Sequence, residues 1–387
     1  MIDTHNIKAN IPRLEWTEAR RIVIKIGSAL LVDCNNGKLK LAWLNSITDE
    51  ILKLRAQHKD VVVVSSGSIA LGRNLIGLPP GPLELDYSQA AAAVGQISLA
   101  HAYQDVFHQR GMVAAQILLT LDDTEERRRY LNARCTIEAL LDRGVVPIVN
   151  ENDTVATTEI RYGDNDRLSA RVANIIGADC LVLLSDIDGL YTSPSYVGQS
   201  SCRIDEVREI TPEIEAMAGC SGNTIARGGM VTKLEAAKIA LAAGTHMVIS
   251  SGRVLRPLKV LSEGGPCTWF IAQSDPVTTK KRWISGLLKH AGYIHIDKGA
   301  ERALLEGRSL LPAGVKRIEG CFDRGDVVVI KSIAGVELGR GLIAYSNIDA
   351  KRILGKKSTE IVGILGYNGR SELIHRDDMA LMRKSVK

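Results

Sequence analysis

Hydrophobic and polar positions along the first 262 residues alternate between two patterns. Short apolar runs rich in β-branched residues predict buried strands at Arg21–Ile26, Val61–Ser65, Gly111–Leu118, Val145–Val149, Cys180–Leu184 and His246–Ile249. Between them, stretches with a helical period predict helices at Leu41–His58, Ser88–Gln109, Arg127–Arg143, Arg167–Ile176 and Met230–Ala243. Apolar strands separated by amphipathic helices are typical of a parallel sheet that is covered on both faces. We therefore expect an α/β fold with three layers, α/β/α.

The pattern changes after Ser262–Pro276, a stretch with Gly and Pro that indicates a domain boundary. Short strands are predicted beyond it at Tyr293–Ile296, Val327–Ile330, Val336–Leu338 and Gly341–Tyr345, with helices at Ala300–Glu306 and Asp349–Leu354. This pattern predicts a second, small β-rich domain. The predicted organisation is a leader at 1–17, a first domain at 18–262, a linker at 263–277, a second domain at 278–377 and a tail at 378–387.

Composition narrows the class of protein. With 387 residues, of which 45% are hydrophobic and 24% charged, the chain is long enough for two domains, and global disorder is excluded. The seven cysteines form no Cys-x-x-Cys pair, which is typical of reduced thiols in a cytosolic protein. No apolar run approaches the roughly 20 residues of a membrane span, and the N-terminus lacks a signal-peptide core. These features predict a cytoplasmic protein that does not enter a membrane.

Charge is distributed unevenly along the chain. Residues 277–387 hold 21 Lys and Arg against 12 Asp and Glu, whereas the remainder holds 28 against 32. A basic C-terminal domain after a slightly acidic first domain indicates that the two parts meet different partners.

Two acidic, amide-rich turns carry the strongest sign of a binding site. Asn150-Glu151-Asn152-Asp153 ends a predicted strand, and Gly163-Asp164-Asn165-Asp166 opens a predicted helix. In open α/β folds, ligands bind at the carboxyl edge of the sheet, where both turns are expected to lie. Carboxylates and amides together suit a ligand that carries an ammonium group. An amino acid is therefore a more natural ligand here than a nucleotide.

Other turns suit the binding of phosphate. Lys25 ends the first predicted strand just before Gly27, and Ser65-Ser66-Gly67-Ser68 follows the second strand. Ser185-Asp186 ends another strand, and Gly228–Lys233 opens a predicted helix, whose N-terminal N–H groups would attract an anion. The chain has neither Gly-x4-Gly-Lys-Ser/Thr nor Gly-x-Gly-x-x-Gly, which excludes a Walker A loop and a dinucleotide fingerprint.

Taken in order, these motifs resemble the amino acid kinase family. The resemblance rests on Val-Ile-Lys-Ile-Gly-Ser, Val-Ser-Ser-Gly-Ser-Ile-Ala, Ile-Val-Asn-Glu-Asn-Asp, Gly-Asp-Asn-Asp-Arg-Leu-Ser-Ala, Leu-Ser-Asp-Ile-Asp-Gly-Leu-Tyr and Gly-Gly-Met-Val-Thr-Lys. It covers roughly residues 20–262 and is greatest for the members that phosphorylate glutamate. Residues 278–377 resemble a PUA domain, an RNA-binding type of module. The resemblance implies ATP-dependent phosphorylation of the γ-carboxylate of L-glutamate to L-glutamyl 5-phosphate, the first step of proline biosynthesis.

The resemblance also assigns roles to single residues. The implied catalytic residues are Lys25, Lys233 and Asp166, the implied glutamate contacts are Ser66, Asp153 and Asn165, and the implied ATP contacts are Lys25, Ser185, Asp186, Arg227, Gly228, Gly229, Met230, Val231, Thr232 and Lys233. Asp166 would orient the lysines and would not act as a base. Mg²⁺ would be held by ATP and water, with no dedicated protein ligand. Asp123 and Glu159 match positions linked to feedback inhibition by proline, and both are expected to line the glutamate site.

Some points depart from the family pattern or stay open. Arg227 stands where the family usually has threonine, and Ser185 also replaces a threonine. Other family members act on aspartate, acetylglutamate, carbamate or UMP, and a different class of function would be an RNA-binding protein with an inert kinase-like body. The resemblance further implies a homo-oligomer and transfer of the labile product to glutamate-5-semialdehyde dehydrogenase. RNA is a candidate partner of the second domain, but we do not expect RNA binding to be its main role.

Overall fold

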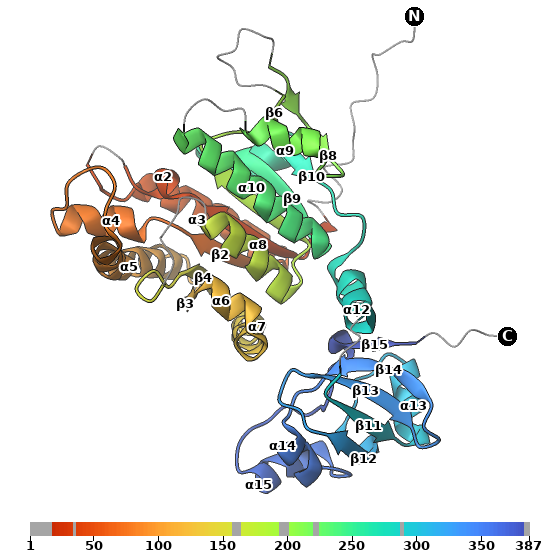
Figure 1. Ribbon diagram of the computed structural model, residues 1–387. Helices are drawn as coiled ribbons and strands as arrows, with labels where there is room; N and C mark the ends of the chain where they lie inside the picture. The colour runs from red at the N-terminus through yellow and green to blue at the C-terminus, as the bar shows by residue number, and fades with distance from the viewer. Residues whose placement is uncertain are drawn as a thin grey trace, which may run out of the picture. The chain divides into compact units, whose positions relative to one another are not determined.

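The computed structural model divides the chain into two compact units, Met1–Pro276 (unit 1) and Val277–Lys387 (unit 2) (Figure 1). It describes residues 18–33, 36–156, 164–192, 201–219, 224–286 and 290–382. The predicted leader at 1–17 therefore lies outside the described residues.

Unit 1 is built around an eight-stranded sheet in the order β3-β4-β2-β1-β5-β9-β10-β8. Its strands are β1 Arg21–Ile26, β2 Asp60–Ser65, β3 Ala114–Leu119, β4 Val146–Glu151, β5 Cys180–Ser185, β8 Glu206–Val207, β9 His246–Ser251 and β10 Cys267–Phe270. All neighbouring pairs are parallel except β10 with β9, which is antiparallel. A separate two-stranded sheet pairs β6 Leu190–Tyr191 with β7 Arg203–Ile204.

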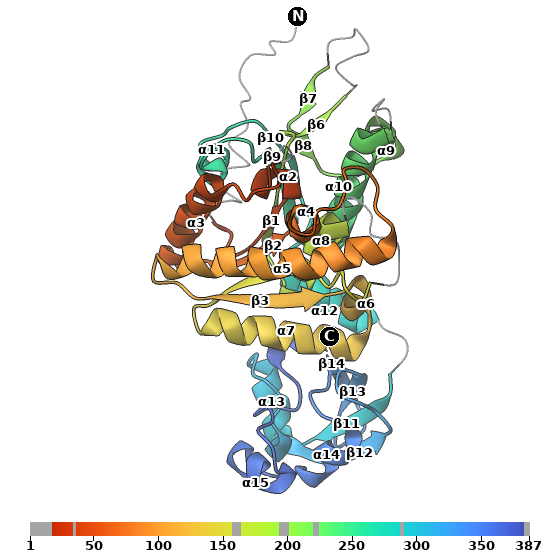
Figure 2. The same cartoon turned by 90° about the vertical axis from the view of Figure 1, so that its left-hand side faces the viewer.

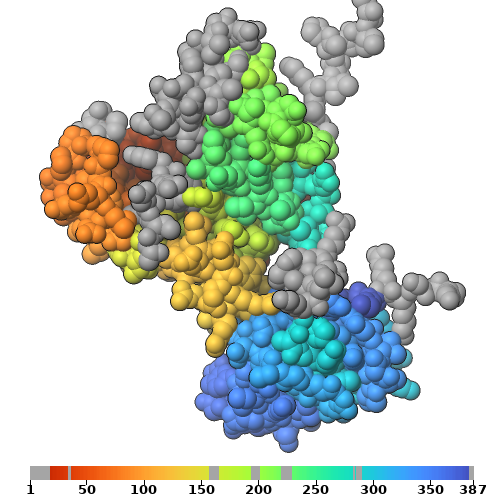
Figure 3. Space-filling model, viewed as in Figure 1, coloured from red at the N-terminus to blue at the C-terminus, as the bar shows by residue number. Residues whose placement is uncertain are grey.

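Helices cover both faces of this sheet, as the apolar strands predicted. The helices of unit 1 are α2 Ser28–Leu31, α3 Leu41–Ala56, α4 Ser68–Leu75, α5 Leu85–His108, α6 Leu121–Glu125, α7 Arg127–Asp142, α8 Asp164–Ile176, α9 Pro212–Gly219, α10 Thr224–Ala242 and α11 Pro257–Ser262. Figure 3 shows the green surface of α9 and α10 on one side of unit 1 and the yellow surface of α6 and α7 beside it.

Alternate residues of the central strands enter two different cores. On β1, Ile22 and Ile24 pack into a core with α3, α5 and α11, whereas Val23 packs into a core with α7, α8 and α10. Side chains of a strand point alternately to opposite faces, so a strand buried on both sides must be apolar at every position. The predicted three-layer α/β/α architecture is confirmed.

Helices α4 and α5 pack against each other more closely than side chains normally allow (Figure 2). A Cβ atom placed on Gly72 of α4 would lie 1.7 Å from the carbonyl oxygen of Ala91, and one on Gly95 of α5 would lie 1.8 Å from that of Ser68. Both glycines are required for this approach. The contact fixes the start of α4, which follows directly on Ser66 and Gly67.

Unit 2 contains a five-stranded sheet in the order β12-β11-β13-β14-β15, in which only the pair β11 and β13 is parallel. Its strands are β11 Gly292–Ile296, β12 Val315–Gly320, β13 Val327–Ser332, β14 Glu337–Leu342 and β15 Met379–Leu381. Its helices are α12 Pro276–Gly286, α13 Lys298–Leu305, α14 Asn347–Arg352 and α15 Ile361–Leu365, with 3₁₀ turns at Pro312–Gly314, Ser358–Glu360 and Arg376–Asp378. The predicted small β-rich domain is confirmed.

The structure corrects the sequence prediction in three places. Residues 263–277 were expected to form a linker, but Cys267–Phe270 is strand β10 of the large sheet. Residues 378–387 were expected to form a tail, but Met379–Leu381 is strand β15 of the small sheet. The two predicted strands Val336–Leu338 and Gly341–Tyr345 are one strand, β14. Pairing with other strands decided each case, and the local pattern does not contain that information.

Among the described residues, none of the helices has both the length and the apolar character that crossing a membrane requires.

Candidate active site

Four parallel strands of unit 1 end side by side at one edge of the sheet. In the register of β1 with its neighbours, Ile26 pairs with Ser65 of β2 and with Leu184 of β5. The residues that follow these strand ends therefore meet at the same edge, together with the end of β4. This is the position where open α/β folds bind ligands.

A buried carboxylate lies between two ammonium groups at this edge. Asp166 Oδ1 is 2.6 Å from Lys25 Nζ, and Asp166 Oδ2 is 3.1 Å from Lys233 Nζ. The side chain of Asp166 is only 2% exposed, and those of Lys25 and Lys233 are 10% and 9% exposed. Burial by itself raises the pKa of Asp166, but the charges of the two lysines outweigh it and hold the pKa below its usual value. Asp166 is therefore ionised at neutral pH, and the group carries one net positive charge.

The three charged residues come from three separate elements. Lys25 is on β1, Asp166 is in the first turn of α8, and Lys233 is on α10. Thr232 Oγ1 also donates to Asp166 Oδ2, at 3.2 Å, and Lys233 Nζ donates to the carbonyl oxygen of Gly229, at 3.2 Å. These contacts hold both lysines in place before any ligand binds. The structure thus brings together all three residues predicted to be catalytic.

The part of the site that was predicted to bind the amino acid consists of Ser66, Asp153 and Asn165, and is called the acceptor side below. It is built around Asn165. Its Nδ2 donates to Ser66 Oγ at 2.9 Å, to the carbonyl oxygen of Ser65 at 3.2 Å and to Asn150 Oδ1 at 3.1 Å. Its Oδ1 is buried and has no hydrogen-bond partner among the described residues. A buried acceptor without a donor is costly, which suits a site whose ligand supplies the missing N–H group.

Asp153 adds a second acceptor to this side. It is buried at the turn after β4, and its Oδ2 accepts a hydrogen bond from Ser68 Oγ at 3.1 Å. Ser68 begins α4, and Gly67 before it has φ 110°, a left-handed conformation that side chains other than glycine rarely adopt. The conformation of Gly67 places both Ser66 and Ser68 at the acceptor side.

Ser185, the last residue of β5, and Asp186 after it were predicted to contact ATP. Ser185 Oγ donates to Asp186 Oδ1 at 3.0 Å, and Arg253 Nη2 lies 3.8 Å from Asp186 Oδ2. The carbonyl oxygen of Ser185 accepts a hydrogen bond from the N–H of Gly252 at 2.7 Å, which ties the turn after β5 to the turn after β9.

The predicted anion site at Gly228–Lys233 needs a correction. Helix α10 begins at Thr224, so Gly228 and Gly229 lie within it and not at its N-terminus. The free N–H groups of the first helical turn therefore belong to residues before Gly229. Glycine is tolerated inside a helix at a cost of about 1 kcal/mol. The sequence pattern alone had placed the two glycines at the N-terminus of the helix. The side chains at 224–228, Arg227 included, lie outside the described set.

The two residues predicted to be linked to inhibition have different outcomes. Asp123 caps α6 in the structure: its Oδ2 accepts from both the N–H and Oγ1 of Thr120, each at 2.8 Å, and its Oδ1 is 2.9 Å from Arg129. Burial raises the pKa of Asp123, but these hydrogen bonds outweigh it and keep the pKa below its usual value. Glu159 lies outside the described residues.

Sequence reasoning missed some residues of the site. Asn150 and Ser68 were noticed only as parts of longer motifs. In the structure, Asn150 is hydrogen-bonded to Asn165 and Ser68 to Asp153. Gln96 of α5 was not noticed at all, and its Oε1 accepts a hydrogen bond from Asn150 Nδ2 at 2.7 Å. The asparagine after a buried strand was a usable signal, but a glutamine on a long helix carries none.

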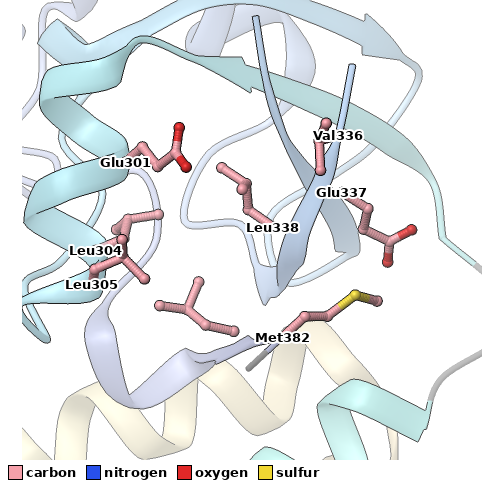
Figure 4. Close-up of a pocket in the computed structure, with 8 residues that line it drawn as sticks. Glu301, Leu304, Leu305, Val336, Glu337, Leu338 and Met382 are labelled. Carbon is pink, nitrogen blue, oxygen red and sulfur yellow. The ribbon is translucent and has the colours of Figure 1, made fainter. Parts of the chain in front are cut away.

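A pocket in unit 2 is unrelated to these residues. Figure 4 shows it between α13, β14 and the end of β15. It has a volume of about 230 Å³ and is lined by Glu301, Leu304, Leu305, Val336, Glu337, Leu338, Leu381 and Met382. Its lining is mainly apolar, and none of the described lining residues was predicted to belong to the site.

Comparison with known families agrees with this geometry. A model of the amino acid kinase family matches residues 20–251, and a model of the PUA domain matches residues 292–365. The first match contains the strands and helices that carry the charged group and the acceptor side. The second covers most of the five-stranded sheet of unit 2, which confirms the predicted type of C-terminal domain.

Curated relatives share nearly the whole length of the chain and are named glutamate 5-kinase. The protein of Nitrobacter hamburgensis is 55% identical over 368 residues, which are 95% of this chain and 97% of the relative. That of Agrobacterium fabrum is 57% identical over 378 residues, 98% of this chain and 97% of the relative. That of Paramagnetospirillum magneticum is 55% identical over 363 residues, 94% of this chain and 98% of the relative.

Proposed function

The chain belongs to the amino acid kinase family, and we propose that it transfers the γ-phosphoryl group of ATP to the γ-carboxylate of L-glutamate. The product is L-glutamyl 5-phosphate, the first intermediate of proline biosynthesis. The observation that carries the proposal is the buried group Lys25–Asp166–Lys233 beside the amide-lined acceptor side. The similarity to glutamate 5-kinases over nearly the full length supports the choice of glutamate.

The chemistry of the reaction explains the kind of residues at the site. A glutamate carboxylate has a pKa near 4.3, so it is already ionised at neutral pH and needs no general base. The main obstacle is the repulsion between the anionic nucleophile and the anionic phosphoryl group. Lys25 and Lys233 supply positive charge to the transferring group, and Asp166 holds both ammonium groups in position.

Different residues of the acceptor side contact different parts of glutamate. Asn165 Oδ1 and the carboxylate of Asp153 accept hydrogen bonds from the ammonium group, and Ser66 contacts the substrate from the turn after β2. An ammonium recognised in this way separates glutamate from acetylglutamate, which has none. The length of the side chain separates glutamate from aspartate, because the carboxylate must reach the lysines.

ATP is the phosphoryl donor, and we propose that it binds at Ser185, Asp186 and the segment 227–233, with Mg²⁺ on its phosphates. Among the described residues, no group of three or more His, Cys, Asp or Glu side chains is placed to hold a metal ion. Mg²⁺ would be bound mainly by phosphate oxygens and water. When bound there, Mg²⁺ would supply positive charge that offsets the charge of the phosphates.

Trapping of the product tests the proposal. Purified protein with ATP and Mg²⁺ is offered glutamate, aspartate or acetylglutamate, and hydroxylamine converts any acyl phosphate to a hydroxamate. We expect a signal with glutamate alone. Lys233→Met should abolish it, whereas Lys238→Met should not, because Lys238 is on the same helix but half exposed and paired with Glu215. If none of the three acceptors gives a signal, the proposed kinase activity is refuted, and an RNA-binding protein with an inert kinase-like body is favoured.

We further propose that proline inhibits the enzyme at the glutamate site through Asp123 and Glu159. Glu159→Ala should then weaken inhibition by proline while the enzyme stays active. Unchanged inhibition in this variant would count against the proposal.

RNA is a secondary candidate partner of unit 2, supported by the match to the PUA domain and by the excess of Lys and Arg in residues 277–387. Binding through phosphate contacts requires an affinity that falls steeply with salt. A titration of labelled single-stranded RNA at low and high salt tests this, and no binding at low salt would end the idea.

Two assembly proposals follow from the family. We propose a homo-oligomer, which sedimentation of the purified protein tests directly. We also propose that the labile acyl phosphate passes to glutamate-5-semialdehyde dehydrogenase. Semialdehyde formation by the two enzymes that continues when hydroxylamine is present to trap the free acyl phosphate would support transfer between them.

A further inference from the structure

Three carboxamide side chains form a continuous hydrogen-bonded chain that leads from α5 to the acceptor side. Gln96 Oε1 accepts from Asn150 Nδ2 at 2.7 Å, and Asn150 Oδ1 accepts from Asn165 Nδ2 at 3.1 Å. Asn150 Nδ2 also lies 3.4 Å from Ser68 Oγ. Asn150 is 1% exposed, so this amide chain is closed to bulk water at its centre.

The direction of each hydrogen bond depends on the one before it. A carboxamide has an oxygen that accepts and a nitrogen that donates, and rotation by 180° exchanges them. Gln96 Oε1 requires a donor, which turns Asn150 Nδ2 toward it and leaves Asn150 Oδ1 facing Asn165. Asn165 Nδ2 is held as the donor by Asn150 Oδ1 together with the carbonyl oxygen of Ser65, which can only accept, and its Oδ1 is the atom left without a partner among the described residues.

Loss of the acceptor atom Gln96 Oε1 would leave the orientation of the Asn150 amide unfixed. Without Gln96 Oε1, Asn150 can rotate and present its Nδ2 to Asn165 Nδ2, so that two donors face each other. Asn165 can relieve the conflict only by rotating as well, which gives up its hydrogen bond to the Ser65 carbonyl oxygen and presents N–H groups where its Oδ1 had been. A substrate ammonium group consists only of donors, so this arrangement repels it.

Packing alone does not fix the amide chain. Gln96 and Asn150 line a cavity of about 230 Å³ together with Ser65, Tyr103 and Gln104. The remaining lining residues that the structure describes are Leu99, Ala100, Ala114, Ala115, Gln116 and Ile148, and none of the described lining residues is charged. Space beside the two amides allows their rotation, which means that the hydrogen bond and not steric confinement selects the orientation.

We propose that Gln96 is a positioning residue for the amino acid substrate, acting through Asn150 to keep the carboxamide oxygen of Asn165 facing the substrate ammonium. Gln96 itself does not touch the reacting atoms. The inference rests on the proposed function, because it assumes that Asn165 receives an ammonium group. It adds a residue on α5 to a site that is otherwise built from strand ends and the start of α8.

Steady-state kinetics of three variants test the inference. Gln96→Met keeps the length of the side chain and removes the acceptor, so we expect KM for glutamate to rise about tenfold or more, as for the loss of one hydrogen bond to a charged group. KM for ATP should stay within twofold. Gln96→Glu retains an acceptor oxygen and should stay close to wild type. Gln104→Met is the matched control on the same helix and cavity, and should leave KM for glutamate unchanged.

Other outcomes distinguish failure of the positioning role from failure of the proposed function and from misfolding of a variant. Equal KM for glutamate in Gln96→Met and Gln104→Met would overturn the positioning role, as would a loss in Gln96→Glu as large as in Gln96→Met. If the wild-type protein neither binds nor phosphorylates glutamate, the proposed function fails and the inference falls with it. Circular dichroism and thermal melting of each variant identify a folding defect, and Gln96→Glu then decides the question.

Discussion

Replacing Asp166 by asparagine removes one negative charge from a buried site that holds two ammonium groups. The substitution keeps the size and shape of the side chain, so no cavity is created. Lys25 Nζ and Lys233 Nζ, now 2.6 and 3.1 Å from the carboxylate, would face each other across a neutral amide. Neither lysine can reach water easily, because their side chains are 10% and 9% exposed.

The size of the effect follows from this burial. Removing one partner of a buried ion pair costs about 3–5 kcal/mol of unfolding free energy, because it leaves a charge buried without compensation. Here two ammonium groups lose the same partner, so we expect Asp166→Asn to reach this range. We also expect kcat to fall at least about a hundredfold, as when a positioned electrostatic group is lost from an active site.

A second aspartate provides the control. Asp60 also has two cationic partners, Arg21 Nη2 at 3.2 Å and Arg55 Nη1 at 3.1 Å, but its side chain is 32% exposed. Ion pairs near the surface contribute about 0–1 kcal/mol, so Asp60→Asn should cost no more than this and leave activity intact. Urea unfolding followed by circular dichroism measures both free energies, and the hydroxamate assay measures activity.

The pH dependence sharpens the test. The pKa of Asp166 in the folded protein lies below its usual value, so its contribution is complete above the unfolded pKa of about 3.9. It is lost as the pH falls through the lower, folded pKa. The difference between wild type and Asp166→Asn should therefore be constant from pH 5 to 8 and shrink in stronger acid. Equal stability of Asp166→Asn and Asp60→Asn at pH 7 would refute the reasoning.

Three further predictions concern packing and titration. Gly95→Ala should lower the unfolding free energy by about 1–3 kcal/mol or more in urea titrations, because its Cβ would meet the Ser68 carbonyl at 1.8 Å. Gly229→Ala should raise stability by about 0.4–1 kcal/mol in the same assay, since a Cβ there meets nothing within 4 Å inside α10. Burial lowers the pKa of His246, whose Nδ1 accepts from the Ala272 N–H. Its neutral form is thus favoured by folding, so stability should fall as the pH drops below about 6.5, and less so in His246→Gln.

The accuracy of the sequence prediction differed between element types. Val61–Val64 reads as a strand because every side chain is apolar, and all four are fully buried in the structure. Strand β10 was missed because its few residues follow a stretch with Gly and Pro, and it exists only by pairing with β9 and β8. The start of α10 was predicted six residues late, at Met230, because Gly228 and Gly229 were taken to precede the helix. Glycine usually marks a turn or a helix end, and here it lies inside the helix.

The sequence by itself determined the layers, the strand ends and the kinds of polar residue that follow them, because hydrophobic periodicity reports which faces of each element are buried. Only the tertiary structure decided which of these residues meet. Lys233 and Asp166 are 67 residues apart in the chain, and Gln96 and Asn150 are 54 apart. These pairs depend on the strand order β4-β2-β1-β5 and on the close packing of α4 on α5, which no local pattern encodes. Burial is a property of each segment, whereas a site is a property of how the segments are arranged.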